Sequence, residues 1–433
     1  FTEPLHEVMV SGIDRFALRA LENSQAERES RWQRDYTSPE AYVKSVADNR
    51  ERLRTIIGAV DPRVPDVEIE IVTSVGLKPL RMVETPEYAV IPVRWQVPDG
   101  VTAEGLLLHP VNDRPAARVV ALPDAGWTPE DFAGLSPDSN PQASIPLRLV
   151  RSGCQVLVPT LISRDDTFSG NPQVAMTNPP HREFRYRMAF QMGRHVIGYE
   201  VQKVLAAVDA FTALNRLHST DVPIGVLGVG EGGLIAFHSA AVDPRIDAAA
   251  VSGYFQRREG VWEEPIYRNV WSQLTEFGDA EIAGLIAPRP LVIEAAAIPE
   301  VAGPPEPRQG RRGGAAPGRI ETAPFDSVKS EFERAKAHYD KLKVGDKIVL
   351  TGSTGTGPPG RDETLAAFAG SLGIGALSDR DASPRTEIRR TVDPEARQKR
   401  QVEELVEFTQ ELLEASATKR DQFWSKASRS SVD

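Results

Sequence analysis

Short apolar runs alternate with helical stretches through the middle of the chain. Residues 198–214 and 234–241 repeat apolar side chains at the spacing of one helix face. Buried strands that alternate with helices are typical of a mostly parallel sheet with helices on both faces. The pattern therefore predicts the α/β class. The runs that we expect to form buried strands are residues 118–122, 155–159, 223–227, 248–252, 290–295 and 347–351.

The two ends of the chain read differently from this middle part. Residues 1–60 are expected to be helical, with Ser38 as an N-cap, Pro39 at the first helical position and Gly58 as a terminator. In the tail, Asp393 and Pro394 begin an amphipathic helix. An apolar face of the N-terminal helix is formed by Tyr42, Val46, Leu53 and Ile57, and three early strands are expected at 67–73, 88–97 and 104–109, with a turn at Asp99-Gly100.

These segments suggest three parts. We expect an N-terminal helical extension over residues 1–64, an α/β domain over 65–375, and a linker with the C-terminal amphipathic helix over 376–433. Within the α/β domain, residues 298–320 are rich in Pro, Gly and Arg and predict an irregular loop.

Composition narrows the function classes. The 433 residues carry a formal net charge of −10, which argues against a nucleic-acid-binding face. No run reaches the roughly 18 apolar residues that a membrane helix needs. The single cysteine, Cys154, lies in an apolar run and is expected to be a buried strand residue. No histidine spacing suggests a metal site, and we expect no cofactor.

The most informative motif lies between a predicted strand and a predicted helix. Residues 225–234 read Gly-Val-Leu-Gly-Val-Gly-Glu-Gly-Gly-Leu, which fits a nucleophile elbow, Gly-x-Nuc-x-Gly, flanked by Gly228 and Gly232. The nucleophile position is then Gly230, which has no side chain to react. Glycine adopts the strained backbone of such a turn at little steric cost. The backbone N–H of Glu231 would form half of an oxyanion hole.

The same glycines allow a second interpretation. Gly228, Gly230 and Gly233 match the Gly-x-Gly-x-x-Gly pattern of dinucleotide-binding folds. Glu231 would then place a negative charge where a pyrophosphate should lie. The next strand also ends at Ser252-Gly253-Tyr254 without the acidic residue that binds a ribose.

Three segments together carry a resemblance to a known family. Residues 193–200 (Gly-Arg-His-Val-Ile-Gly-Tyr-Glu) precede the helix before the elbow, and residues 286–293 (Ile-Ala-Pro-Arg-Pro-Leu-Val-Ile) enter a later strand. With the elbow between them, residues 65–375 resemble the acetylxylan-esterase and dienelactone-hydrolase branch of the α/β hydrolases. The resemblance implies an α/β-hydrolase fold and carbohydrate-ester chemistry.

The catalytic triad that the resemblance implies carries over poorly. Its serine falls on Gly230. Its acid would follow the strand at 290–295, where the chain offers Glu294 and Glu300. Its histidine would lie within residues 351–364, which contain none. His338 comes earlier, in a predicted helix at 327–342, and is expected to be a surface residue.

Other polar residues are expected to meet the elbow at one edge of the sheet, because parallel strands end on the same side. They would form a net acidic concavity that suits a neutral carbohydrate, or a pocket closed by its own side chains. The predicted lining is Asp124, Trp127, Arg164, Asp165, Asp166 and Glu231. Residues 181–187 mix charges with aromatic rings and predict a surface helix start after Pro179-Pro180, or a segment that lines this site.

Three functional hypotheses follow. The first is a pseudo-hydrolase that binds or supports, the second an active carbohydrate ester hydrolase that uses Glu231 or the Asp165-Asp166 pair, and the third a nucleotide-binding domain. The resemblance also implies an exported bacterial protein in which a second hydrolase domain or chain follows Asp433, since residues 420–426 read as a lead-in.

Overall fold

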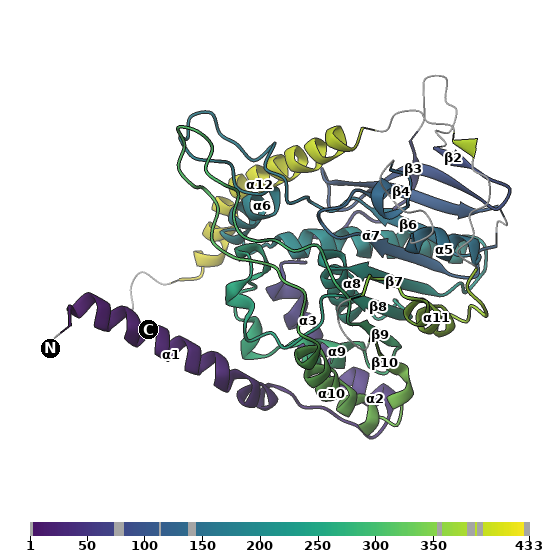
Figure 1. The fold of residues 1–433 in the computed structure, drawn as a ribbon, viewed down its shortest axis with the longest axis horizontal. Helices are drawn as coiled ribbons and strands as arrows, with labels where there is room; N and C mark the ends of the chain where they lie inside the picture. Colours follow the sequence, from purple (N-terminus) through teal and green to yellow (C-terminus); the bar gives the residue numbers. More distant parts are fainter. Residues whose placement is uncertain are drawn as a thin grey trace.

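The computed structural model describes residues 3–72, 82–111, 114–136, 144–352, 357–378, 386–387 and 393–427. One large twisted sheet forms its centre, and helices cover both faces (Figure 1). Helix α1 (Leu5–Arg28) extends away from this body at the lower left of the view.

The sheet joins two kinds of strand. Strands β5 to β10 run parallel, while β1 to β4 and β11 pair antiparallel at one side. The order is β10-β9-β8-β7-β5-β6-β4-β3-β2-β11, with β1 on β3. The bounds are β1 Glu70–Ile71, β2 Val83–Glu84, β3 Tyr88–Gln96, β4 Thr102–Pro110, β5 Arg118–Leu122, β6 Gln155–Pro159, β7 Ile224–Val229, β8 Ala248–Ser252, β9 Leu291–Glu294, β10 Ile348–Thr351 and β11 Thr386–Glu387.

Helices pack on the two faces because alternate side chains of each strand point to opposite sides. In β5, Val120 joins one hydrophobic cluster with α3, α7, α8, α9 and α10, whereas Val119 joins a second cluster with α5 and α11. The helices other than α1 are α2 Pro39–Ser45, α3 Ala47–Ile56, α4 Pro129–Phe132, α5 Ile145–Arg151, α6 His181–Phe190, α7 Val196–Leu217, α8 Glu231–Val242, α9 Asp279–Ile286, α10 Phe325–Lys341, α11 Asp362–Ser371 and α12 Pro394–Trp424.

The six buried strands predicted from apolar runs are confirmed as β5 to β10, within two residues at each end. The caps at Ser38 and Asp393 are confirmed as well, since each side chain accepts backbone N–H groups of the helix that it precedes. Cys154 is buried, as expected.

Two predictions of extent were wrong. The helix expected from Ser38 to Gly58 is divided at Val46, whose φ of −100° and ψ of 9° separate α2 from α3. Of the strand expected at 67–73, residues 67–72 are described, and among these only Glu70–Ile71 form a strand, which pairs with β3. Hydrophobic periodicity does not report such local changes, because the same side chains reach the core in either arrangement.

Candidate functional site

The turn between β7 and α8 has the geometry of a nucleophile elbow. Gly230 adopts φ 55° and ψ −116°, a conformation that side-chain-bearing residues rarely take, and α8 begins at the next residue, Glu231. A Cβ on Gly232 would collide with the backbone carbonyl of Leu122 in β5. The predicted backbone of the elbow is therefore confirmed, and its small residues let α8 start against the neighbouring strand.

The place of the missing nucleophile is taken by Asp124, which follows β5. A Cβ built on Gly230 would collide with the Asp124 Oδ2 atom. That oxygen accepts the backbone N–H of Glu231 at 3.0 Å, and Oδ1 accepts the N–H of Gly126 at 2.9 Å. The Asp124 side chain is completely buried. The N–H group that would serve an oxyanion hole is thus bound to a carboxylate of the chain itself.

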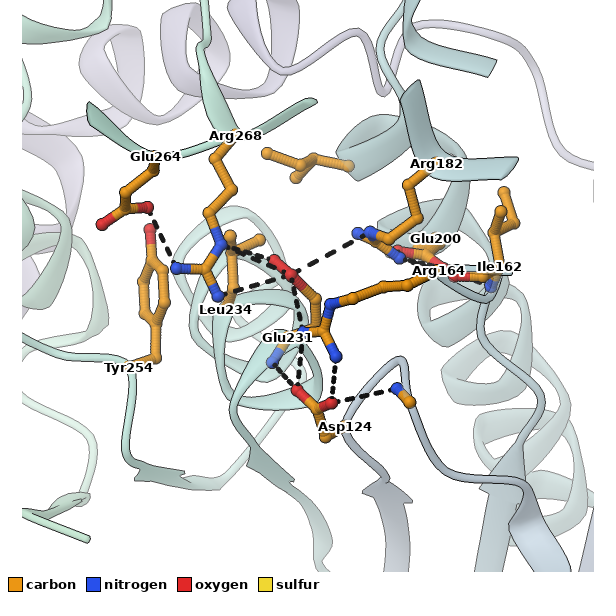
Figure 2. Close-up of polar contacts among 12 residues, drawn as sticks. Asp124, Ile162, Arg164, Arg182, Glu200, Glu231, Leu234, Tyr254, Glu264 and Arg268 are labelled. Carbon is orange, nitrogen blue, oxygen red and sulfur yellow. Dashed lines mark hydrogen bonds and ion pairs between the residues drawn. The ribbon is translucent and has the colours of Figure 1, made fainter. Parts of the chain in front are cut away.

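Arginine side chains neutralise this buried carboxylate and its neighbour (Figure 2). The Arg164 guanidinium binds both oxygens of Asp124, with Nη2 at 2.9 Å from Oδ2, and its Nη2 lies 3.5 Å from Glu231 Oε2. Arg268 Nε donates to Glu231 Oε1 at 2.7 Å, and Arg182 Nε lies 3.9 Å from Oε2. Three guanidinium groups therefore surround one carboxylate.

Two further carboxylates, of Glu200 and Glu264, pair with these arginines. Arg182 Nη1 lies 2.9 Å from Glu200, and it donates to the Ile162 carbonyl at 3.0 Å. Arg268 Nη1 donates to Glu264 at 3.0 Å. We call Asp124, Arg164, Arg182, Glu200, Glu231, Glu264 and Arg268 the elbow cluster.

The electrostatics of Glu231 follow from these contacts. Burial by itself would raise the pKa of this carboxyl, but the positive charges of Arg268, Arg182 and Arg164 outweigh burial and lower the pKa to about 2. A carboxylate with so low a pKa is a weak general base at neutral pH. Both Asp124 and Glu231 have no exposed surface.

The structure brings together only part of the predicted lining. Asp124, Arg164 and Glu231 meet in the elbow cluster. Asp166 lies apart and pairs with Arg308 at 2.6 Å. The Asp165 carbonyl accepts the N–H of His181 at the start of α6, and Trp127 stacks on Phe132 with ring centroids 6.1 Å apart.

The cavity beside the cluster differs from the net acidic concavity that the sequence suggested. It has a volume of about 160 Å³, and of the six predicted lining residues only Arg164 borders it. Its other walls include Tyr267, Glu183 and part of the loop at 301–318. The prediction failed because the carboxylates of Asp124 and Glu231 point into the protein, toward arginines that lie far away in the sequence.

The residues expected at the triad's acid position have structural contacts. Glu294, at the end of β9, accepts hydrogen bonds from Ser252 Oγ at 2.6 Å and Thr364 Oγ1 at 2.7 Å. It also accepts the N–H groups of Gly360 and Arg361, just before α11. Both carboxylate oxygens are therefore engaged in joining β8, β9 and α11. Glu300 accepts one long hydrogen bond, 3.4 Å, from the N–H of Thr322.

Three of the seven histidines are bound by other groups of the chain. His338, which we expected at the surface, is buried instead, and its Nδ1 atom lies 2.7 Å from the Tyr36 hydroxyl. The helix α10 that carries it packs on α9 and covers that face, which explains the error. His195 caps α7, and His238 bonds to the Leu234 carbonyl. Burial lowers the pKa of both of these histidines.

A serine–histidine pair that the sequence did not suggest lies near the cluster. Ser163 Oγ is 3.0 Å from His181 Nδ1. His181 Nε2 accepts the N–H of Phe168 at 2.9 Å, so Nδ1 carries the proton and donates to the serine. Burial lowers the pKa of His181 to about 4. This histidine therefore cannot take a proton from Ser163 in the observed arrangement.

Helix α6 corrects one further expectation. It begins at His181 after Pro180, as predicted, but it is not a surface helix, because Arg182 and Arg185 are buried. Within the described part of the chain, no three His, Cys, Asp or Glu side chains gather as a possible metal site. No helix in that part is long and apolar enough to cross a membrane.

Comparison with known proteins rests on structure alone. No family model matches the chain, and no curated protein matches its sequence. Among solved structures, an acetyl xylan esterase from Bacteroides fragilis is 15% identical with a TM-score of 0.51, over 77% of this chain and 80% of the other. A glucuronoyl esterase from Solibacter usitatus is 13% identical with a TM-score of 0.47, over 78% and 94%. The first similarity agrees with the sheet order described above. The chain has the α/β-hydrolase fold.

Proposed function

We propose that this chain is a non-catalytic α/β-hydrolase-fold protein in which the former reaction centre has become part of the core. One observation carries the proposal. Asp124 Oδ2 occupies the space of a nucleophile side chain and takes the Glu231 N–H that would stabilise an oxyanion. A serine hydrolase needs both the nucleophile and a base within hydrogen-bond reach of it. Gly230 has no side chain to act as the nucleophile, and the group nearest to its missing side chain is the Asp124 carboxylate, which Arg164 binds.

An active hydrolase with an unusual site has less support. Glu231 is buried and its pKa is lowered to about 2, so it is a poor base and cannot meet a substrate without rearrangement. The Asp166 carboxylate is bound by Arg308, and among the described residues neither the Asp165 nor the Asp166 carboxylate contacts Asp124 or Glu231.

The nucleotide-binding alternative is opposed by the same contacts. The start of α8, where a pyrophosphate would lie, already holds the Asp124 carboxylate. A phosphate there would have to displace this carboxylate from both the Glu231 N–H and the Arg164 guanidinium. We therefore propose a structural role for the glycines of the elbow, which let α8 pack closely on β5 and β7.

Carbohydrate binding at the elbow is also disfavoured, because the cavity beside it is small and Asp124 and Glu231 are sealed from solvent. We propose that this site is closed by its own side chains and that the chain acts as a structural or partner-binding module. The second hydrolase domain expected after Asp433 stays a prediction.

Labelling with a fluorophosphonate probe tests the proposal. The purified chain should remain unlabelled, while a serine esterase at the same concentration is labelled in the same mixture. Covalent labelling of the folded chain at a serine, lost after heat denaturation, would contradict it. In parallel, calorimetric titration with xylan oligosaccharides and with nucleotides should give no binding. A nucleotide Kd below about 1 mM, roughly −4 kcal/mol, would instead support the third hypothesis.

A further inference from the structure

Arg185, in α6, is a buried cation without a counter-charge. It is one of five arginines in the described chain whose exposed fraction is below 2%. The other four each lie within 2.9 Å of a carboxylate. None of the three guanidinium nitrogens of Arg185 has a hydrogen-bond partner among the described residues. The four paired arginines are Arg28, Arg182, Arg258 and Arg397.

The unpaired arginine lies where three helices meet. α6 packs against both α7 and α12, and Figure 1 shows α6 beside α12. Tyr199 of α7 is close enough to act on the Arg185 charge, and its ring packs edge-to-face on Phe408 of α12 with centroids 6.0 Å apart. The side chains that α12 buries between residues 401 and 409 are all neutral. They are Gln401, Val402, Leu405 and Thr409.

The positive charge of Arg185 persists at neutral pH. Burial lowers the pKa of its guanidinium to about 10, which is still well above 7. A buried charge is costly unless an opposite charge and hydrogen bonds compensate it. The Phe184 ring, 4.7 Å from the Arg185 Cζ atom, offers a cation–π contact. Such a contact supplies no acceptor in the plane of the guanidinium, so the N–H groups still need one.

We propose that Arg185 binds a small monovalent anion at the junction of α6, α7 and α12. A planar guanidinium presents parallel N–H donors that match the two oxygens of a carboxylate, and the same donors can hold a halide ion. One bound anion supplies both the missing acceptor and the missing negative charge. A single charge equals that of Arg185, whereas a dianion would leave an excess charge buried. The proposal does not depend on whether the elbow is catalytic.

Thermal unfolding of the full chain tests this at constant ionic strength, with chloride or formate replacing the bulky anion gluconate. The midpoint of the wild type should rise by about 2 °C or more up to roughly 100 mM and then level off as the site fills. Arg185→Met removes the charge and should abolish this rise. Arg187→Met is the matched control, because Arg187 lies on the same helix but is half exposed and paired with Glu183. It should keep the response.

Nuclear magnetic resonance of the anion measures binding without relying on the folding of a variant. The wild type should broaden the chloride or the formate resonance, and an excess of the other anion should reverse the broadening. A response to formate alone would support the proposal and identify a carboxylate as the ligand. The proposal is overturned if the wild type responds to neither anion, or if folded Arg185→Met responds as strongly as the wild type.

Discussion

Two buried carboxylates at the ends of parallel strands show how differently this fold uses the same group. Asp124, after β5, is neutralised by the Arg164 guanidinium and belongs to a network of charges. Glu294, at the end of β9, is surrounded by neutral donors, namely two hydroxyl and two backbone N–H groups. The elbow is therefore held by compensated charges, whereas the β9 corner is held by directional hydrogen bonds.

The difference predicts unequal costs of mutation. A buried ion pair adds little net stability, but removing one partner leaves a charge without compensation. A carboxylate bound by neutral donors leaves only unsatisfied polar groups when it is changed. Substitutions in the elbow cluster should thus be costlier than those at the β9 corner, and surface pairs should matter least.

The largest effect is expected for Glu231→Gln. It removes the negative charge at the meeting point of Arg164, Arg182 and Arg268, so the free energy of unfolding should fall by about 3–5 kcal/mol. Urea denaturation at pH 7 measures this. A loss below about 1 kcal/mol would show that the three arginines are compensated by other groups.

The pH dependence of the same variant sharpens this prediction. The folded-state pKa of Glu231, about 2, lies below its ordinary value of 4.5. Its stabilising contribution is therefore complete above pH 4.5 and is lost as the pH falls toward 2. The stability difference between wild type and Glu231→Gln should shrink across this window. A difference that stays constant from pH 5 to pH 2.5 would contradict the assigned pKa.

Gly230→Ala should be the next most costly change, at about 2–3 kcal/mol. An alanine Cβ at a φ of 55° is strained, and it would also displace Asp124 Oδ2 from the Glu231 N–H. Gly12→Ala is the control, because Gly12 lies within α1 and a Cβ there meets no atom. It should be neutral or slightly stabilising. Equal effects at the two positions would remove the argument for a filled elbow.

A smaller loss is expected for Glu294→Gln, about 1–2 kcal/mol. The amide keeps one acceptor oxygen but turns its NH₂ group toward donors at the start of α11. Unfolding by urea again gives the value. If the loss exceeds that of Glu231→Gln, the contrast between the two regions is wrong.

Asp166→Asn should have the smallest effect, below about 1 kcal/mol, since its partner Arg308 is more than half exposed. Addition of salt should reduce even this difference, because an exposed pair is screened. A larger loss would indicate that the loop at 298–320 depends on this contact.

The sequence allowed the sheet and the elbow to be predicted, because both leave local signals. Apolar runs identified β5 to β10, and glycines at 228, 230 and 232 identified a tight turn before α8. The elbow cluster could not be predicted. Asp124 is 40 residues from Arg164, and Glu231 is 37 residues from Arg268. From sequence alone, charged residues that lie far apart along the chain cannot be distinguished from solvent-exposed ones.

His338 and Arg182 were misjudged for a related reason. Each lies in a helix whose composition is polar enough for the surface, yet each is buried. Burial of such side chains depends on a partner from another element, here Tyr36 and Glu200. Periodicity within one helix carries no information about that partner.

Turnover of an acetyl ester by the wild type and by Gly230→Ser tests the central claim most directly. The serine would restore a hydroxyl at the nucleophile position, but its Cβ would collide with Asp124 Oδ2, and the elbow cluster contains no histidine that could serve as the base. The account predicts no turnover above buffer for the wild type and less than a tenfold gain for the variant, about 1.4 kcal/mol of barrier. Turnover by the wild type, or a larger gain in folded Gly230→Ser, would contradict it.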